Sequence, residues 1–129
     1  MEDRKILIDT SIVIDFLRSK NKSQTQFIKL LIDNTLFISS ISIFELYNGA
    51  TDEYKIQIID SICKNFEVIN FDLDIAKKAS ELFLQLRSKN KLIEFRDILI
   101  GATAIQHALP IATKNKKHFQ RLVGVNIFN

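Results

Sequence analysis

Short apolar runs alternate along this chain with longer segments of helical periodicity. The apolar runs occupy residues 5–8, 36–38, 67–70 and 111–113, with 125–127 as a candidate for a fifth. The helical segments occupy residues 12–18, 23–33, 42–50, 53–64, 73–89 and 97–108. Brief continuous apolar runs are typical of buried parallel strands, and strands that alternate with helices indicate an α/β fold around a mostly parallel sheet. Gly101 in the middle of 97–108 predicts close packing of that helix against the sheet.

Length and composition favour one globular domain spanning residues 1–129. The 129 residues are 47% hydrophobic and 26% charged, and they include only three glycines and one proline. So few chain-breakers argue against a turn-rich β-sandwich. The single cysteine excludes an internal disulfide, and no Cys/His cluster has zinc spacing. Residues 2–4 are charged, and the first apolar run stops at Asp9, so we expect no signal peptide, no membrane span and a cytoplasmic location.

Basic residues are concentrated in the last third of the chain. Residues 87–121 hold eight basic and two acidic side chains, whereas the remainder holds ten basic and thirteen acidic ones. This segment predicts polyanion binding beside a charged site, with a solvated lysine-rich face as the alternative.

Three acidic residues stand where ligands bind in parallel sheets, beyond the carboxyl ends of the strands. Asp9 follows the first apolar run, Glu45 lies in the expected first turn of the helix after the second run, and Asp97 opens the helix before the fourth. Each has a simpler explanation taken singly. Asp9 is a candidate helix cap, Ser42 to Glu45 fits a capping box, and an acid at the start of a helix is favoured by the helix dipole.

Taken together, the three carboxylates would repel one another unless a cation lies among them. Hard cations with oxygen ligands, above all Mg²⁺ or Mn²⁺, are the usual solution, and such a cluster can hydrolyse phosphodiesters. The sequence offers no Gly-rich phosphate loop, and His107 and His118 are interpreted as structural or surface residues rather than as catalytic bases. Arg96 either pairs with a neighbouring carboxylate or binds a phosphate group.

Four ordered segments resemble the PIN-domain ribonucleases of the VapC toxin type. They are Ile8-Asp9-Thr10-Ser11 continuing through Ile14-Asp15, Ser39 to Leu46 with Gly49, Arg96 to Ala104, and Ile111 to Phe119. The resemblance implies a three-layer fold with a parallel sheet of about five short strands. It also implies endoribonuclease activity with Mg²⁺ or Mn²⁺, homodimerisation, and inhibition by a cognate antitoxin protein.

The resemblance also assigns roles to individual residues. It implies Asp9, Glu45 and Asp97 as catalytic metal ligands, with supporting hydroxyl groups from Thr10 or Ser11 and from Thr113. Many family members have a fourth acid where this chain has Asn115, whose amide can bind a metal without contributing charge. This departure puts a tightly held second metal in doubt. For RNA binding, the predicted residues are Arg96, Lys114, Lys116 and Lys117.

Two alternatives to a nuclease remain open at this point. A PIN-like module that binds RNA or protein without catalysis would account for Asn115 as the mark of a decayed site. A protein that uses Asp9 as a phospho-acceptor is the weaker alternative, because such a phosphatase would want a second acid at the position held by Ser11.

Overall fold

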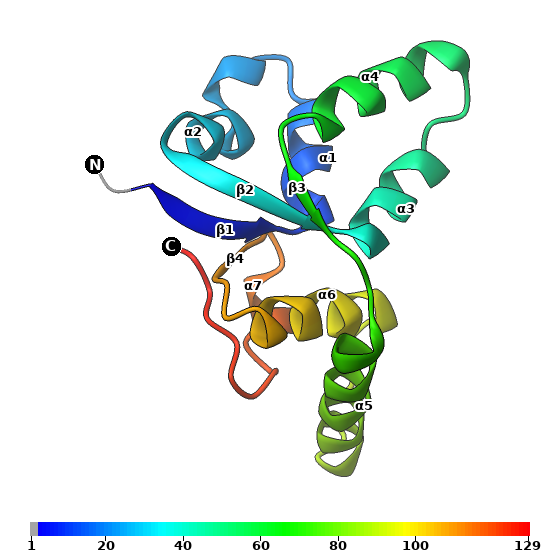
Figure 1. Cartoon of the computed structure of the whole chain (residues 1–129), viewed down its shortest axis with the longest axis vertical. Helices are drawn as coiled ribbons and strands as arrows, with labels where there is room; N and C mark the ends of the chain where they lie inside the picture. The colour runs from blue at the N-terminus through cyan, green and yellow to red at the C-terminus, as the bar shows by residue number, and fades with distance from the viewer. Residues whose placement is uncertain (1–2) are drawn as a thin grey trace.

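A four-stranded parallel sheet forms the centre of the computed structural model, which describes residues 3–129 (Figure 1). The strands are β1 (Arg4–Ile8), β2 (Asn34–Ser39), β3 (Glu67–Ile69) and β4 (Ile111–Ala112). Their order in the sheet is β3-β2-β1-β4, and all three pairings are parallel. The predicted α/β class is therefore confirmed. Met1 and Glu2, which belong to the predicted domain 1–129, lie outside the described residues.

The expected count of about five strands is slightly too high. The segment 125–127 approaches β4, but the only residues that form a bridge there are Ile111 and Ile127. Two backbone hydrogen bonds hold this contact, from Ile111 N–H to Asn126 O and from Phe128 N–H to Ile111 O, each 2.9 Å long. Because β4 is only two residues long, the C-terminal segment has no room for a longer ladder.

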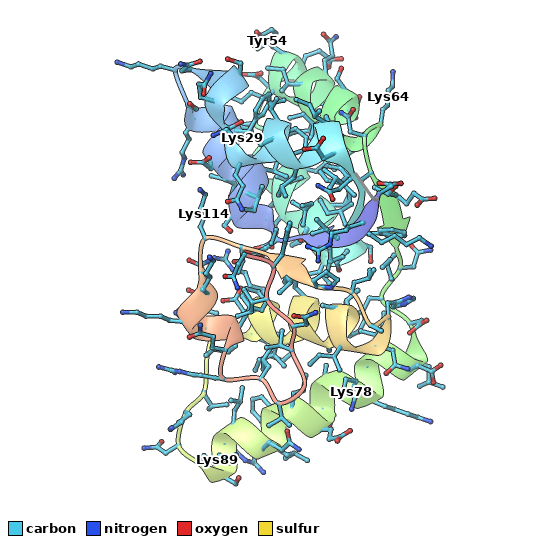
Figure 2. All side chains as sticks on the ribbon, turned by 90° about the vertical axis from the view of Figure 1, so that its left-hand side faces the viewer. Lys29, Tyr54, Lys64, Lys78, Lys89 and Lys114 are labelled. Atoms are coloured by element: carbon cyan, nitrogen blue, oxygen red, sulfur yellow. The ribbon has the colours of Figure 1, made fainter. Side chains whose placement is uncertain are left out.

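Helices cover both faces of the sheet. They are α1 (Thr10–Arg18), the 3₁₀ turn η1 (Lys22–Gln24), α2 (Gln26–Asp33), α3 (Ser40–Asn48), α4 (Glu53–Cys63), α5 (Leu73–Ser88), α6 (Phe95–Gln106) and α7 (Lys116–Phe119). Figure 1 shows α1 to α4 above the sheet and α5 and α6 below it. Figure 2 shows the same layering by labelled side chains, with Tyr54 of α4 and Lys89 beyond α5 at opposite ends of the molecule.

Alternation along β1 divides the core into two parts. Ile6 and Ile8 pack into a cluster formed with α1 to α4, whereas Leu7 packs into a second cluster formed with α5 and α6. This is the two-residue periodicity of a strand buried on both faces, and it explains why β1 is apolar throughout its second half. The sheet edge where β1 and β4 end is consequently fixed by packing on both sides.

Gly101 permits a close approach, although not the predicted one. A Cβ at this position would stand 2.1 Å from Leu122 Cδ1 and 3.5 Å from Phe119 Cδ1. The glycine of α6 therefore makes room for the C-terminal segment rather than for the sheet. None of the helices within residues 3–129 is both long and apolar enough to cross a membrane.

Candidate metal centre

Asp9 stands at the carboxyl edge of the sheet, between the ends of β1 and β4. Its backbone N–H donates to Ala112 O at 2.9 Å, so that Asp9 lies beside Thr113, the first residue after β4. Asp9 precedes α1 in the N-cap position, but within the described chain its side chain makes no capping hydrogen bond. The capping explanation for Asp9 is therefore wrong, and its carboxylate, which is 2% exposed, has other partners.

Two hydroxyl groups hold the Asp9 carboxylate. Ser11 Oγ donates to Asp9 Oδ2 at 2.6 Å, and Thr113 Oγ1 donates to the same oxygen at 2.7 Å. Each hydroxyl group also accepts a backbone N–H, from Lys114 at 3.0 Å for Ser11 and from Asn115 at 2.9 Å for Thr113. In residues 3–129, Asp9 Oδ1 has no hydrogen-bonding partner, so one oxygen of this carboxylate is left for a ligand.

Asp97 is the second buried acid of the site. It is the third residue of α6 and is 2% exposed. His118 donates from Nδ1 to Asp97 Oδ2 at 2.9 Å. Burial raises the pKa of the Asp97 carboxyl group; the hydrogen bond from His118 opposes this, and the charge of Asp9 raises the pKa further. Because the surroundings of Asp97 leave its negative charge under-compensated, they favour the approach of a cation.

Glu45 is held differently from the two aspartates. Helix α3 starts earlier than expected, with Ser39 as its N-cap accepting the Ile41 N–H, so Glu45 is the sixth helical residue. The capping-box explanation and the predicted first-turn position are both wrong. Thr10 donates to Glu45 Oε1 at 2.7 Å, and Arg96 donates from Nη1 to Glu45 Oε2 at 2.8 Å. Both carboxylate oxygens are thus engaged within the protein.

The two aspartates face one cavity of about 340 Å³, whereas Glu45 lines a neighbouring groove. The lining residues of the cavity are Asp9, Thr10, Ser11, Ile14, Asp15, Arg18, Arg96, Asp97, Lys114 and Asn115. Across residues 3–129, no three His, Cys, Asp or Glu side chains are grouped as ligands of one metal ion. The structure therefore brings Asp9 and Asp97 together and leaves Glu45 paired with Arg96, so the assignment of all three as ligands stays a prediction.

The predicted RNA-binding lysines surround a second cavity of about 560 Å³, next to the first. Lys114 and Asn115 line both cavities, while Lys116 and Lys117 line the second. Figure 2 shows Lys114 beside the segment after β4, with its side chain extending away from the ribbon. This arrangement puts positive charge beside the acidic pair, as polyanion binding requires. Arg96 differs, because its guanidinium is turned to Glu45.

Sequence reasoning missed the contact between His118 and Asp97. The four-residue helix α7 was not predicted, and it is this helix that carries His118 back to the start of α6. The sequence gives one signal for this contact. His118 follows Thr113 by five residues, and Thr113 ends an apolar run whose carboxyl end is expected at the site.

The protein is thus an α/β protein with two buried acids at the carboxyl edge of its parallel sheet and lysines beside them. The family model of the PIN domain matches residues 6–125, and the chain belongs to this family. It is similar to Ribonuclease VapC1 of Methanocaldococcus jannaschii, with 32% identity over 99% of this chain and 90% of the relative. It is also 24% identical to the tRNA(fMet)-specific endonuclease VapC of Salmonella typhimurium, over 95% of this chain and 96% of the relative.

Chains in two solved structures share the fold. The VapBC2 complex of Rickettsia felis bound to a promoter DNA fragment contains a chain that aligns with a TM-score of 0.84 and 25% identity, over 97% of this chain and 98% of that one. FitAcB of Neisseria gonorrhoeae gives a TM-score of 0.79 and 27% identity, over 96% of both chains. The resemblance to VapC-type PIN domains drawn from the four sequence segments is confirmed.

Proposed function

We propose that this protein is a divalent-metal-dependent endoribonuclease that acts in the cytoplasm as the toxin of a toxin–antitoxin pair. The observation that carries the proposal is the pair of buried carboxylates, Asp9 and Asp97, facing one cavity with a lysine-rich cavity beside it. The names of the relatives, a ribonuclease and a tRNA-specific endonuclease, support RNA as the substrate.

The donor set of the cavity fits a hard divalent cation. Asp9 offers Oδ1, and Asp97 is a buried carboxylate whose pKa is raised by burial and by the charge of Asp9. Carboxylate oxygens are the ligands that Mg²⁺ and Mn²⁺ prefer, and a single cation would offset the repulsion between the two side chains. We assign Asp9 and Asp97 as its primary ligands and Glu45 as a third. When bound, the metal would polarise the phosphoryl oxygen and lower the pKa of the attacking water.

The remaining side chains of the site have separate tasks. Ser11 and Thr113 fix the rotamer of Asp9 through its Oδ2, which keeps Oδ1 directed away from the two hydroxyl groups. Lys114, Lys116 and Lys117 attract and hold the phosphate backbone of RNA. Asn115 lines the same cavity as both aspartates and contributes an uncharged amide where a fourth acid would add negative charge. One tightly held metal is therefore the simplest stoichiometry.

An antitoxin protein is the partner that we propose, because similar chains are found in VapBC complexes. A groove of about 550 Å³ between α1, α3 and α4 offers a largely apolar surface next to the site, and Glu45 and Arg18 are among the residues that line it. The apolar side chains along it are Ile14, Leu17, Leu46, Ala50, Tyr54, Ile58 and Ile59. An amphipathic segment bound there would have its polar side next to the carboxylates.

Homodimerisation is the second association that we propose. Among the exposed large apolar side chains of the described residues are Phe44, Leu73 and Phe95, each about two-thirds exposed. Phe95 borders a predominantly apolar hollow between α5 and α6, which Phe71 and Phe83 also line. Light scattering tests the proposal: we expect a dimer that Phe95→Ser weakens, and a strict monomer at high concentration would contradict it.

RNA cleavage by purified protein tests the proposed activity. We expect Mg²⁺- or Mn²⁺-dependent cleavage that is abolished by EDTA, by Asp9→Asn and by Asp97→Asn. Asp74→Asn is the matched control, because Asp74 is also a first-turn helical acid but lies exposed on α5. Cleavage by the parent and the control alone supports the nuclease. Binding of RNA without cleavage by any protein would favour the alternative of a PIN-like binding module, and equal cleavage by all would indicate a contaminant.

A further inference from the structure

Arg96 occupies the position of a counter-ion within the acidic site. Its Nη1 donates to Glu45 Oε2 at 2.8 Å, its Nε lies 3.1 Å from Glu94 Oε2, and the same Nε lies 3.9 Å from Asp97 Oδ1. One guanidinium thus lies among three carboxylates. It belongs to the residue immediately before Asp97, in the first turn of α6.

The bond between Arg96 and Glu45 is the strongest of these contacts. The Glu45 side chain is only 14% exposed, whereas the Glu94 side chain is 58% exposed. Burial alone would lower the pKa of the Arg96 guanidinium, but the charge of Glu45, the hydrogen bond to it and the charges of Glu94 and Asp97 together outweigh burial and raise the pKa. Charge-assisted hydrogen bonds of this kind are shorter and stronger than neutral ones, and a partly buried pair is less screened by salt.

The same bond removes Glu45 from the set of available ligands. Thr10 occupies Oε1 and Arg96 occupies Oε2, so neither oxygen is free of a donor. The Glu45 carboxylate and the two aspartates line different hollows. A cation that recruits Glu45 must therefore displace at least one of these donors.

We propose that Arg96 is a positioning residue that competes with the divalent cation for Glu45 and thereby weakens metal binding. This inference rests on the proposed metal-dependent function. In the metal-free protein, Arg96 neutralises Glu45 and lies close to Asp97. Metal binding exchanges one positive partner of Glu45 for another, and the cost of breaking the ion pair lowers the apparent affinity for the metal. Arg96 therefore acts through Glu45 and sets the divalent-cation concentration at which the site fills.

The test measures Mn²⁺ affinity directly, by the loss of the free Mn²⁺ signal in electron paramagnetic resonance. We expect Arg96→Gln to bind Mn²⁺ about tenfold more tightly than the parent, since a charge-assisted hydrogen bond no longer competes. Arg18→Gln is the matched control: it removes the same charge from the same cavity, and within residues 3–129 Arg18 forms no ion pair. The expected change for Arg18→Gln is less than about twofold, because the exposed Arg18 forms no ion pair in the described chain that metal binding would have to break and solvent screens its charge.

Two further variants separate competition for Glu45 from other roles of Arg96. Arg96→Lys keeps the charge but loses the planar fork, so its affinity for Mn²⁺ should lie between those of the parent and Arg96→Gln. In a Glu45→Gln background, Arg96→Gln should bring no further gain, because the residue through which Arg96 acts is gone. Circular dichroism of each variant confirms that the protein is folded.

Three results would overturn the inference. They are weaker Mn²⁺ binding by Arg96→Gln, a gain equal to that of Arg18→Gln, and a gain that persists in the Glu45→Gln background. Failure of the proposed nuclease function looks different, because the parent protein would then leave RNA intact whatever the affinity ratio between the variants.

Discussion

Replacing Asp97 with Asn tests whether this residue serves function or stability. Asp97 is a buried carboxylate whose pKa lies above the ordinary value of 3.8, because burial and the charge of Asp9 outweigh the hydrogen bond from His118. Asn is nearly isosteric, carries no charge, and keeps an oxygen that accepts from His118. Without metal, the variant should therefore melt at the same temperature as the parent or a few degrees higher.

The magnitude of the metal effect follows from mass action. At free Mg²⁺ ten times the dissociation constant, binding stabilises the parent by about 1.4 kcal/mol. For a domain of this size, that is a rise in melting temperature of roughly 4–7 °C. Asp97→Asn should lose most of this rise, whereas the exposed first-turn control Asp74→Asn should keep it.

The dependence of stability on pH has a defined sign. The Asp97 carboxyl group has a higher pKa in the folded than in the unfolded chain, so its protonated form favours folding. The stability that protonated Asp97 contributes is fully present below pH 3.8 and is lost as the pH rises through the pKa of Asp97 in the folded protein. Measured without metal, the parent should lose stability relative to Asp97→Asn as pH rises from about 3.8 toward neutrality.

Differential scanning fluorimetry with and without Mg²⁺, at several pH values, measures these quantities. A metal-free Asp97→Asn variant that melts several degrees below the parent would refute the reasoning. Asp97 would then stabilise α6 as a first-turn acid through the helix dipole, which is the explanation that applies to Asp74.

Three smaller predictions come from other parts of the molecule. Thr113→Val should weaken Mn²⁺ binding measured by calorimetry, because it removes the donor that holds Asp9 and the acceptor for the Asn115 N–H; an unchanged affinity would contradict this. The hydrogen bond to Asp60 raises the pKa of Tyr47 to about 12, so the stability that this bond supplies should be present below pH 10 and lost as pH approaches 12. In urea titrations, the free energy of unfolding should therefore fall less between pH 10 and pH 12 for Tyr47→Phe than for the parent. Gly101→Ala forces a Cβ against Leu122 and should cost about 1–3 kcal/mol in the free energy of unfolding, which a variant of unchanged melting temperature would disprove.

The fold was predictable because its elements follow hydrophobic periodicity. The run through Ile8 is buried on both faces, and its end marks the edge of the sheet where Asp9 lies. The sequence pattern places the start of α3 too late, because it offers Ser42 as a cap, whereas Ser39 at the end of β2 caps the helix. The apolar run 125–127 does not form a fifth strand, because Ile127 makes only an isolated bridge to Ile111 of β4.

The site was predictable only in part. Asp9 and Asp97 were located by a topological rule, since parallel strands bring their carboxyl ends to one edge. The hydrogen-bonding partners of Asp9, Glu45 and Asp97 depend on how distant segments pack together, which local sequence patterns do not encode. Arg96 could equally have faced RNA, and only the structure shows its bond to Glu45. The sequence does not reveal the role of His118, because α7, only four residues long, gives no periodic signal.

The central claim is that Asp9 and Asp97 together bind one divalent cation. Anomalous diffraction from crystals soaked in Mn²⁺ tests it most directly. We expect a single strong peak coordinated by oxygens of both aspartates, at distances near the roughly 2.1 Å typical of small divalent cations. A peak bound to other residues, or no peak at a Mn²⁺ concentration that saturates binding in solution, would contradict the claim.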